Sequence, residues 1–161
     1  MKKVILDTNC LIIYVLGLIN PSLIEKHKKT SLYDETDFTL MQGLIKSPDN
    51  LLILPNIWTE VDNLLNRHLN GNYKYYYIET VKKIMEQNVE KYLESKIAAN
   101  DTNMYDIGIT DTLILKEALS CELLITADSD LSDRANGWNV KVFDFKKYKN
   151  DKIKPKHLKY T

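Results

Sequence analysis

The sequence predicts an α/β protein with a parallel central sheet, and three observations support this fold class. The chain has 161 residues, which fits one domain with a substantial core. Short apolar runs recur along it, at 4–6, 51–54, 123–126 and 140–143. Such runs are typical of strands buried on both faces, and helical stretches separate them. Strands that alternate with helices form a parallel sheet covered by helices.

The first half of the chain begins with the strand Val4–Leu6, followed by an apolar helix over 10–19 that Asn20-Pro21 ends. The segment 22–49 is mixed and polar, with a helix expected at 36–46. The second strand, 51–54, ends at Pro55-Asn56.

In the second half we expect a helix over 57–69, a break at Asn70-Gly71-Asn72, and a long helix over 74–99. A polar connection over 100–110 then leads to a third helix over 111–119. The runs 123–126 and 140–143 are the third and fourth strands, and a short helix over 131–135 lies between them.

Charge divides the chain into a domain, 1–145, and a lysine-rich C-terminal tail, 146–161. The domain holds 15 basic and 21 acidic residues, a net charge of −6, whereas seven lysines fall in the tail. The tail is therefore expected to contact phosphates, to lie on the acidic domain, or to remain solvated. With two cysteines and no apolar run of about 20 residues, the sequence predicts a cytoplasmic protein without a membrane span.

Asp7 is the first candidate site residue, because it follows directly after the first strand. Open α/β sheets bind ligands beyond the carboxyl ends of their strands, so Asp7 is expected at the edge of a site. Asp also caps helices well, and a purely capping role at the start of the next helix is the alternative.

Two further carboxylates lie near helix starts. Glu60 lies in the first turns after the second strand, on the rim of an apolar helix face, although it is also suited to stabilising the helix dipole there. Asp111 projects from the apolar side of its helix, where an unpaired carboxylate needs a cation or donors. Either Thr110 or Asp111 itself is expected to cap that helix.

The third strand repeats the arrangement of the first, since Asp128 follows it in Ile125-Thr126-Ala127-Asp128. Asp130 is either a further contributor or the N-cap of the next helix, and the helix start after it favours capping. A parallel sheet would bring Asp7, Glu60, Asp111 and Asp128 to one edge.

Neighbouring carboxylates raise one another's pKa, and a hard divalent cation removes this problem. Oxygen ligands suit Mg²⁺ or Mn²⁺, whereas zinc would be expected to recruit His or Cys.

With these motifs in this order, the chain resembles the PIN-domain family of metal-dependent ribonucleases. The resemblance rests on four short motifs: Asp7-Thr8-Asn9, Thr59-Glu60-Val61, Ile109-Thr110-Asp111-Thr112 and Leu124-Ile125-Thr126-Ala127-Asp128. It implies a three-layer α/β/α fold around a parallel sheet, and an acidic pocket with one or two Mg²⁺ or Mn²⁺ ions.

The resemblance also implies roles for individual residues. Asp7 and Asp128 match direct metal ligands, while Glu60 and Asp111 ligate, hold water or assist proton transfer. Asn9 resembles the polar residue that organises the pocket, with Asp130 as a further supporting residue. The implied reaction is the hydrolysis of single-stranded RNA.

Bacterial toxins of toxin–antitoxin pairs are the functional group that the chain resembles, which implies an antitoxin-like partner and a homodimer. Two features depart from that group: 52 residues separate Asp7 from Glu60, and a lysine-rich tail follows the motifs. A non-catalytic PIN-like scaffold that binds RNA or protein is the alternative.

Basic and aromatic side chains are candidates for contacts with RNA phosphates and bases. The cations are Lys26, Lys28, Lys29, Arg67, Lys74 and the C-terminal lysines; the aromatic residues are Tyr73, Tyr75, Tyr76 and Tyr77. Consecutive residues of a helix point in different directions, so some of these tyrosines must pack inward.

Two other enzyme classes fit less well. A haloacid dehalogenase-like phosphotransferase would need Asp where Asn9 stands, and no glycine-rich nucleotide-binding motif is present.

Overall fold

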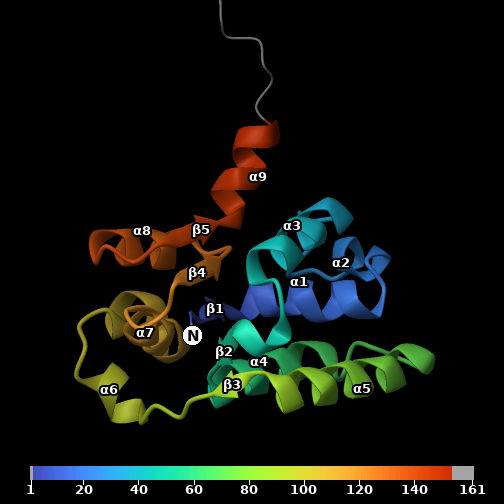
Figure 1. Ribbon diagram of the computed structural model, residues 1–161, viewed down its shortest axis with the longest axis horizontal. Helices are drawn as coiled ribbons and strands as arrows, with labels where there is room; N and C mark the ends of the chain where they lie inside the picture. The colour runs from blue at the N-terminus through green and yellow to red at the C-terminus, as the bar shows by residue number, and fades with distance from the viewer. Residues whose placement is uncertain (1, 154–161) are drawn as a thin grey trace, which may run out of the picture.

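The computed structural model describes residues 2–153, and it is an α/β protein with three layers (Figure 1). Its five strands are parallel and lie in the order β3-β2-β1-β4-β5. Their bounds are β1 Val4–Leu6, β2 Leu51–Ile53, β3 Val89–Glu90, β4 Leu123–Thr126 and β5 Val142–Asp144. The residues of β1, β2 and β4 are all buried, as expected for the centre of a sheet covered on both faces.

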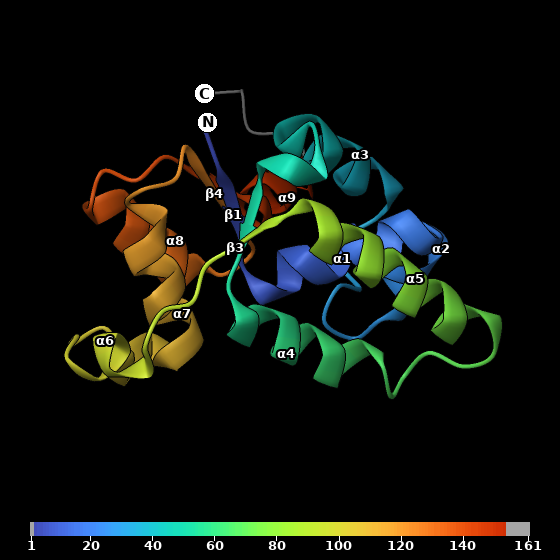
Figure 2. The ribbon, with the colours of Figure 1, turned by 60° about the horizontal axis from the view of Figure 1, so that its bottom comes forward.

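One helical layer comes from the first half of the chain. It contains α1 Thr8–Ile19, α2 Ser22–Lys26, α3 Glu35–Ile45, α4 Pro55–Leu65 and α5 Asn72–Gln87, with the short 3₁₀ helix η1 Pro48–Asn50 before β2. The other layer contains α6 Ser95–Ala99, α7 Met104–Ala118 and α8 Ser129–Gly137. Figure 2 shows the two groups on opposite sides of the strands.

The two layers follow from the handedness of the chain crossovers. The chain moves from β1 to β2 to β3 in one direction, then returns to β4 and β5 on the other side of β1. Because crossovers between parallel strands are right-handed, reversing the direction moves the connecting helices to the opposite face. The order therefore reverses between β1 and β4, where a crevice forms beyond the carboxyl ends of the strands.

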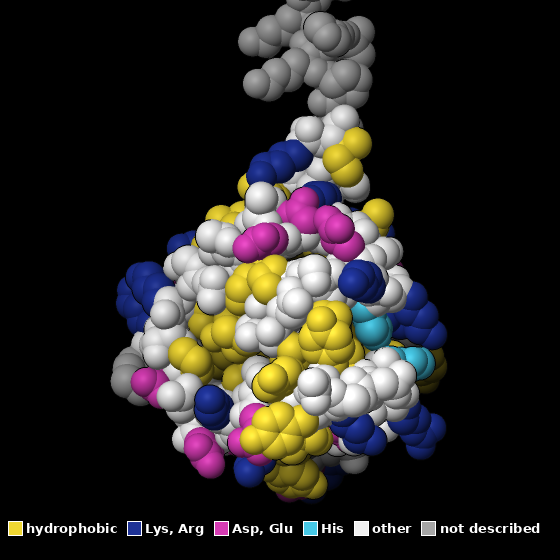
Figure 3. Space-filling view, turned by 90° about the vertical axis from the view of Figure 1, so that its right-hand side faces the viewer, with side chains coloured by type: hydrophobic (Ala, Val, Ile, Leu, Met, Phe, Trp, Pro, Cys, Tyr) yellow, Lys and Arg dark blue, Asp and Glu magenta, His cyan; other side chains and the backbone are white. Residues whose placement is uncertain are grey.

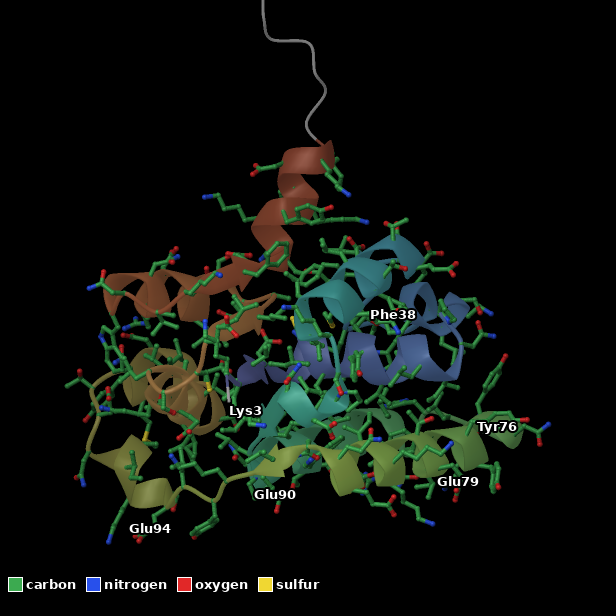
Figure 4. All side chains as sticks on the ribbon, in the orientation of Figure 1. Lys3, Phe38, Tyr76, Glu79, Glu90 and Glu94 are labelled. Atoms are coloured by element: carbon green, nitrogen blue, oxygen red, sulfur yellow. The ribbon has the colours of Figure 1, made fainter. Side chains whose placement is uncertain are left out.

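The central helix of the core is α1, which is buried over Cys10–Gly17 and packs against α2, α3, α4 and α5. Gly17 allows the close approach of α3, because a Cβ atom at this position would lie 2.2 Å from the Phe38 ring. Figure 4 labels Phe38 between the ribbons of α1 and α3. The segment between the first two strands therefore contributes a packed helix to the core.

The structure confirms the predicted strands and most of the helices, with end shifts of one to four residues. The prediction of a single helix over 74–99 is wrong: α5 ends at Gln87, and the edge strand β3 and the short helix α6 follow. Both residues of β3 are exposed, so this strand lacks the apolar run by which the others were predicted.

The predicted polar connection over 100–110 is also wrong in part, because α7 already begins at Met104. Gly108 interrupts this helix with a φ of 79°, a conformation that glycine adopts readily. The residues after the break carry Thr110 and Asp111, so neither of them caps the start of α7.

The start of the lysine-rich segment forms a helix, α9 Phe145–Ile153. Its Lys149 reaches α3 and bonds Asp34 and Asp37 at 3.1 and 2.8 Å. This part of the segment therefore contacts acidic residues of the domain, while 154–161 lie outside the described residues. In the described part of the chain, no helix is long and apolar enough to cross a membrane.

Candidate acidic site at the carboxyl edge of the sheet

Asp7 lies at the point where the strand order reverses, between the end of β1 and the start of α1. It caps α1, because its Oδ1 accepts the Cys10 amide hydrogen bond at 2.8 Å. Its Oδ2 accepts bonds from the Thr126 hydroxyl and, at 2.8 Å, from the Ala127 amide. The side chain therefore ties β1 to the end of β4 as well as capping a helix. Burial raises the pKa of Asp7, and these hydrogen bonds oppose the effect.

Asp128 occupies the equivalent position after β4. Its Oδ1 accepts the Leu131 amide hydrogen bond at 2.9 Å, so Asp128 is the N-cap of α8. The prediction that Asp130 caps this helix is therefore wrong. Asp130 lies in the first turn of α8, exposed, and has no hydrogen bond or ion pair to the described residues.

Glu60 comes from α4, which follows β2, and two threonines hold its carboxylate. The Thr8 hydroxyl donates to Oε2 at 2.6 Å, and the Thr110 hydroxyl donates to Oε1. Thr8 opens α1 and Thr110 lies after the glycine break of α7. Glu60 thus joins three helices, from both layers, at one edge of the sheet.

Asp111 is the carboxylate without a protein partner. It is partly buried, and within the described residues it has no hydrogen bond or ion pair. Burial raises its pKa to about 7, and the charges of Asp7, Asp128 and Glu60 raise it further in that order. The four predicted acids are therefore close enough to interact electrostatically, although they come from four different segments.

Asn9 lies in the first turn of α1 beside this group and is half-buried. The structure gives its side chain no hydrogen bond to the described residues, so Asn9 adds a free amide near the acids.

The threonine hydroxyls are the part of the site that the sequence prediction missed. Thr8, Thr110 and Thr126 each orient a carboxylate on a different element. Each lies one or two residues from an acid of the predicted set, and this adjacency was the available signal.

The donor set suits a hard divalent cation in chemistry more than in present geometry. Carboxylate oxygens are the ligands that Mg²⁺ and Mn²⁺ prefer, and a cation would compensate the repulsion at Asp111. However, among residues 2–153 no three His, Cys, Asp or Glu side chains are grouped closely enough to hold a metal ion. Binding would therefore require the four side chains to move together.

Comparison with known proteins assigns no family. No family model matches the chain, and none of the curated proteins compared matches it. One solved structure is similar, a domain of a functionally unknown protein from Methanocaldococcus jannaschii DSM 2661. It is 20% identical, the match covers 89% of this chain and 91% of that chain, and the TM-score is 0.44.

Proposed function

We propose that the protein is a divalent-metal-dependent endoribonuclease of the PIN type that cleaves single-stranded RNA. The observation that carries this proposal is the interaction of Asp111 with three other carboxylates at the carboxyl edge of the sheet. An uncompensated group of four acids destabilises a fold, which is expected where a site serves catalysis. The order of the four motifs along the chain also supports a PIN-type nuclease.

Asp7, Glu60, Asp111 and Asp128 would hold the Mg²⁺ or Mn²⁺ ion. The chemistry that such an ion supplies is the polarisation of a phosphodiester and a lower pKa for the attacking water. The chain itself contributes orientation: Thr126 and the Ala127 amide fix Asp7, and the Thr8 hydroxyl fixes Glu60.

Asp111 is the residue suited to moving a proton. A carboxyl with a pKa of about 7 exchanges its proton near neutral pH, where general acid–base catalysis is most effective. Because the four groups are coupled, the observed pKa values will belong to the cluster.

The test is cleavage of a single-stranded RNA panel by the purified protein with Mg²⁺ or Mn²⁺. We expect cleavage that stops with a chelator and falls by at least about 100-fold in Asp111→Asn, the order of loss typical of general acid–base groups. Asp133→Asn is the matched control, because Asp133 is an exposed acid on α8.

Cleavage undiminished in Asp111→Asn would refute the proposed site. Binding without cleavage across the panel would favour the non-catalytic RNA-binding scaffold, which the absence of a preformed ligand group in residues 2–153 also favours. The antitoxin-like partner and the homodimer stay predictions, and neither is needed for this test.

A further inference from the structure

A second pocket lies at the other end of α1 and α4, away from the acidic edge. Its volume is about 500 Å³. Two segments that are distant in the sequence form it together with the end of α1. Its lining residues are Leu16, Leu23, Lys26, His27, Lys28, His68, Leu69, Asn70 and Tyr73. The lining thus combines an apolar floor with aromatic and basic side chains, and none of these lining residues is acidic.

The two histidines meet edge to face, with ring centroids 6.1 Å apart. His27 is fixed in place: its Nδ1 accepts the Lys29 amide hydrogen bond, and its Nε2 lies 3.2 Å from the Leu64 carbonyl oxygen. A ring that accepts at Nδ1 and donates at Nε2 is the neutral Nε2–H tautomer. His68 is exposed, so His27 holds it from one side while the rest of its ring faces solvent.

Tyrosines extend this aromatic surface along the start of α5. Tyr73 lines the pocket and is 39% exposed. Tyr75 and Tyr76 follow, with ring centroids 5.7 Å apart, and both are exposed. Figure 4 labels Tyr76 at this outer end of α5. By contrast, Tyr77 is buried and donates to Asp62 at 2.7 Å, so only part of the tyrosine run is available for binding.

Positive charge surrounds the pocket. The cations from its two segments are Lys26, Lys28, Lys29, Arg67 and Lys74, all of them exposed. Among the residues that the structure describes, no ion pair uses any of these five. Figure 3 shows this face with Lys and Arg side chains around the two histidines. The pocket is therefore an uncompensated basic site that can attract an anion.

The pocket and the acidic edge lie along the same helix. Glu60 and His68 are eight residues apart, which corresponds to about 12 Å at the helical rise of about 1.5 Å per residue. About four stacked nucleotides span that distance, at about 3.4 Å each. One short strand can thus reach both places.

We infer that this pocket is a second binding site for single-stranded RNA, in which bases stack on His68 and Tyr73 while Lys26 and Lys28 bind phosphates. The inference rests on the proposed function for its ligand class. Flat aromatic rings interleaved with lysines favour an unpaired nucleic acid strand over an acidic peptide, because bases stack on such rings. The pocket supplies the positive charge that the acidic edge lacks.

The experiment measures binding without cleavage. A fluorescein-labelled single-stranded RNA of about 16 nucleotides is titrated with the full chain in EDTA, and fluorescence anisotropy is recorded at several salt concentrations. The test variants are Lys26→Ala with Lys28→Ala, and Tyr73→Ala. The matched control is Lys82→Ala with Lys83→Ala, which removes two exposed lysines from the far half of α5.

We expect the Lys26/Lys28 double variant to reduce the slope of log K against log salt by about 1.4, the value for two phosphate contacts on a single strand. Tyr73→Ala should weaken binding about tenfold, while Tyr73→Phe and the Lys82/Lys83 control retain it. Circular dichroism and thermal melts confirm that each variant folds.

Equal slopes in the Lys26/Lys28 variant and the control would overturn the inference. So would competition at the pocket by a polyglutamate peptide but not by unlabelled RNA. Asp111→Asn separates this inference from the proposed function, because it should lose cleavage and retain binding in EDTA. A chain that binds RNA through the pocket and never cleaves it would refute only the nuclease.

Discussion

The raised pKa of Asp111 predicts that replacing this acid with Asn will stabilise the protein at alkaline pH. The carboxyl has an ordinary pKa of 3.8 and one of about 7 in the fold. Between these values the folded chain binds more protons than the unfolded chain, so the free energy of unfolding falls as pH rises. The stabilising contribution is complete below pH 4 and is lost as pH passes through about 7.

The size of the effect follows from the same two values. One pKa unit corresponds to about 1.4 kcal/mol, which gives an upper bound of about 4 kcal/mol. Partial exposure of Asp111 and coupling among the acids reduce this to about 2 kcal/mol. We therefore expect Asp111→Asn to be more stable than the native chain by about 2 kcal/mol at pH 8, with little difference at pH 4.

Urea unfolding followed by tryptophan fluorescence measures this difference, because Trp58 is buried in the fold. Other titrating groups cancel when variant and native chain are compared at the same pH. Asp133→Asn should show no difference at either pH. If Asp111→Asn is destabilised at pH 8, or its effect is the same at both pH values, the proposed repulsion among the four acids is wrong.

Two further predictions concern metal binding and core packing. Mg²⁺ or Mn²⁺ at about 100 times its Kd should stabilise the native chain by about 2.7 kcal/mol at pH 8, and Asp111→Asn should lose most of this gain in the same urea assay. Gly17→Ala should destabilise the fold by about 1–3 kcal/mol, because the new Cβ would overlap the Phe38 ring in α3. A third concerns α9: Lys149→Met should lower the free energy of unfolding by about 2 kcal/mol, because Asp37 would stay buried without its cation.

Each of these has a matched control or a contradicting outcome. Gly43→Ala adds a Cβ in α3 with no atom within 4 Å, so it should be neutral or stabilising. Lys147→Met alters an exposed lysine of α9 and should cost little. Losses equal to those of the test variants would contradict both packing arguments, and equal metal stabilisation of Asp111→Asn and the native chain would contradict the metal site.

The predicted elements were most accurate where burial dictates composition. The strand 123–126 was predicted with the bounds that β4 has, because all four of its residues are buried and apolar or small. The edge strand β3 was missed, since exposed strand residues carry no apolar run. The break at Gly108 was predicted as a loop, because a glycine within a polar stretch looks the same whether a helix continues beyond it or not.

For the acidic site, the sequence by itself determined the residue types and their places after strands and at helix starts. A strand followed by a carboxylate is a local pattern, so it is readable without the fold. The sheet order β3-β2-β1-β4-β5 was decided only by the tertiary structure, and it brings Asp7 and Asp128 to the crevice where the order reverses.

The tertiary structure alone also decided which groups hold the acids and which lysines gather. The hydroxyls of Thr8 and Thr110 meet Glu60 across more than forty residues of chain, and the segments at 26–29 and 67–74 form one basic pocket. The physical reason is that such contacts depend on crossover direction and on side-chain packing between layers. Local propensity carries no information about either, whereas it does specify where a buried strand ends.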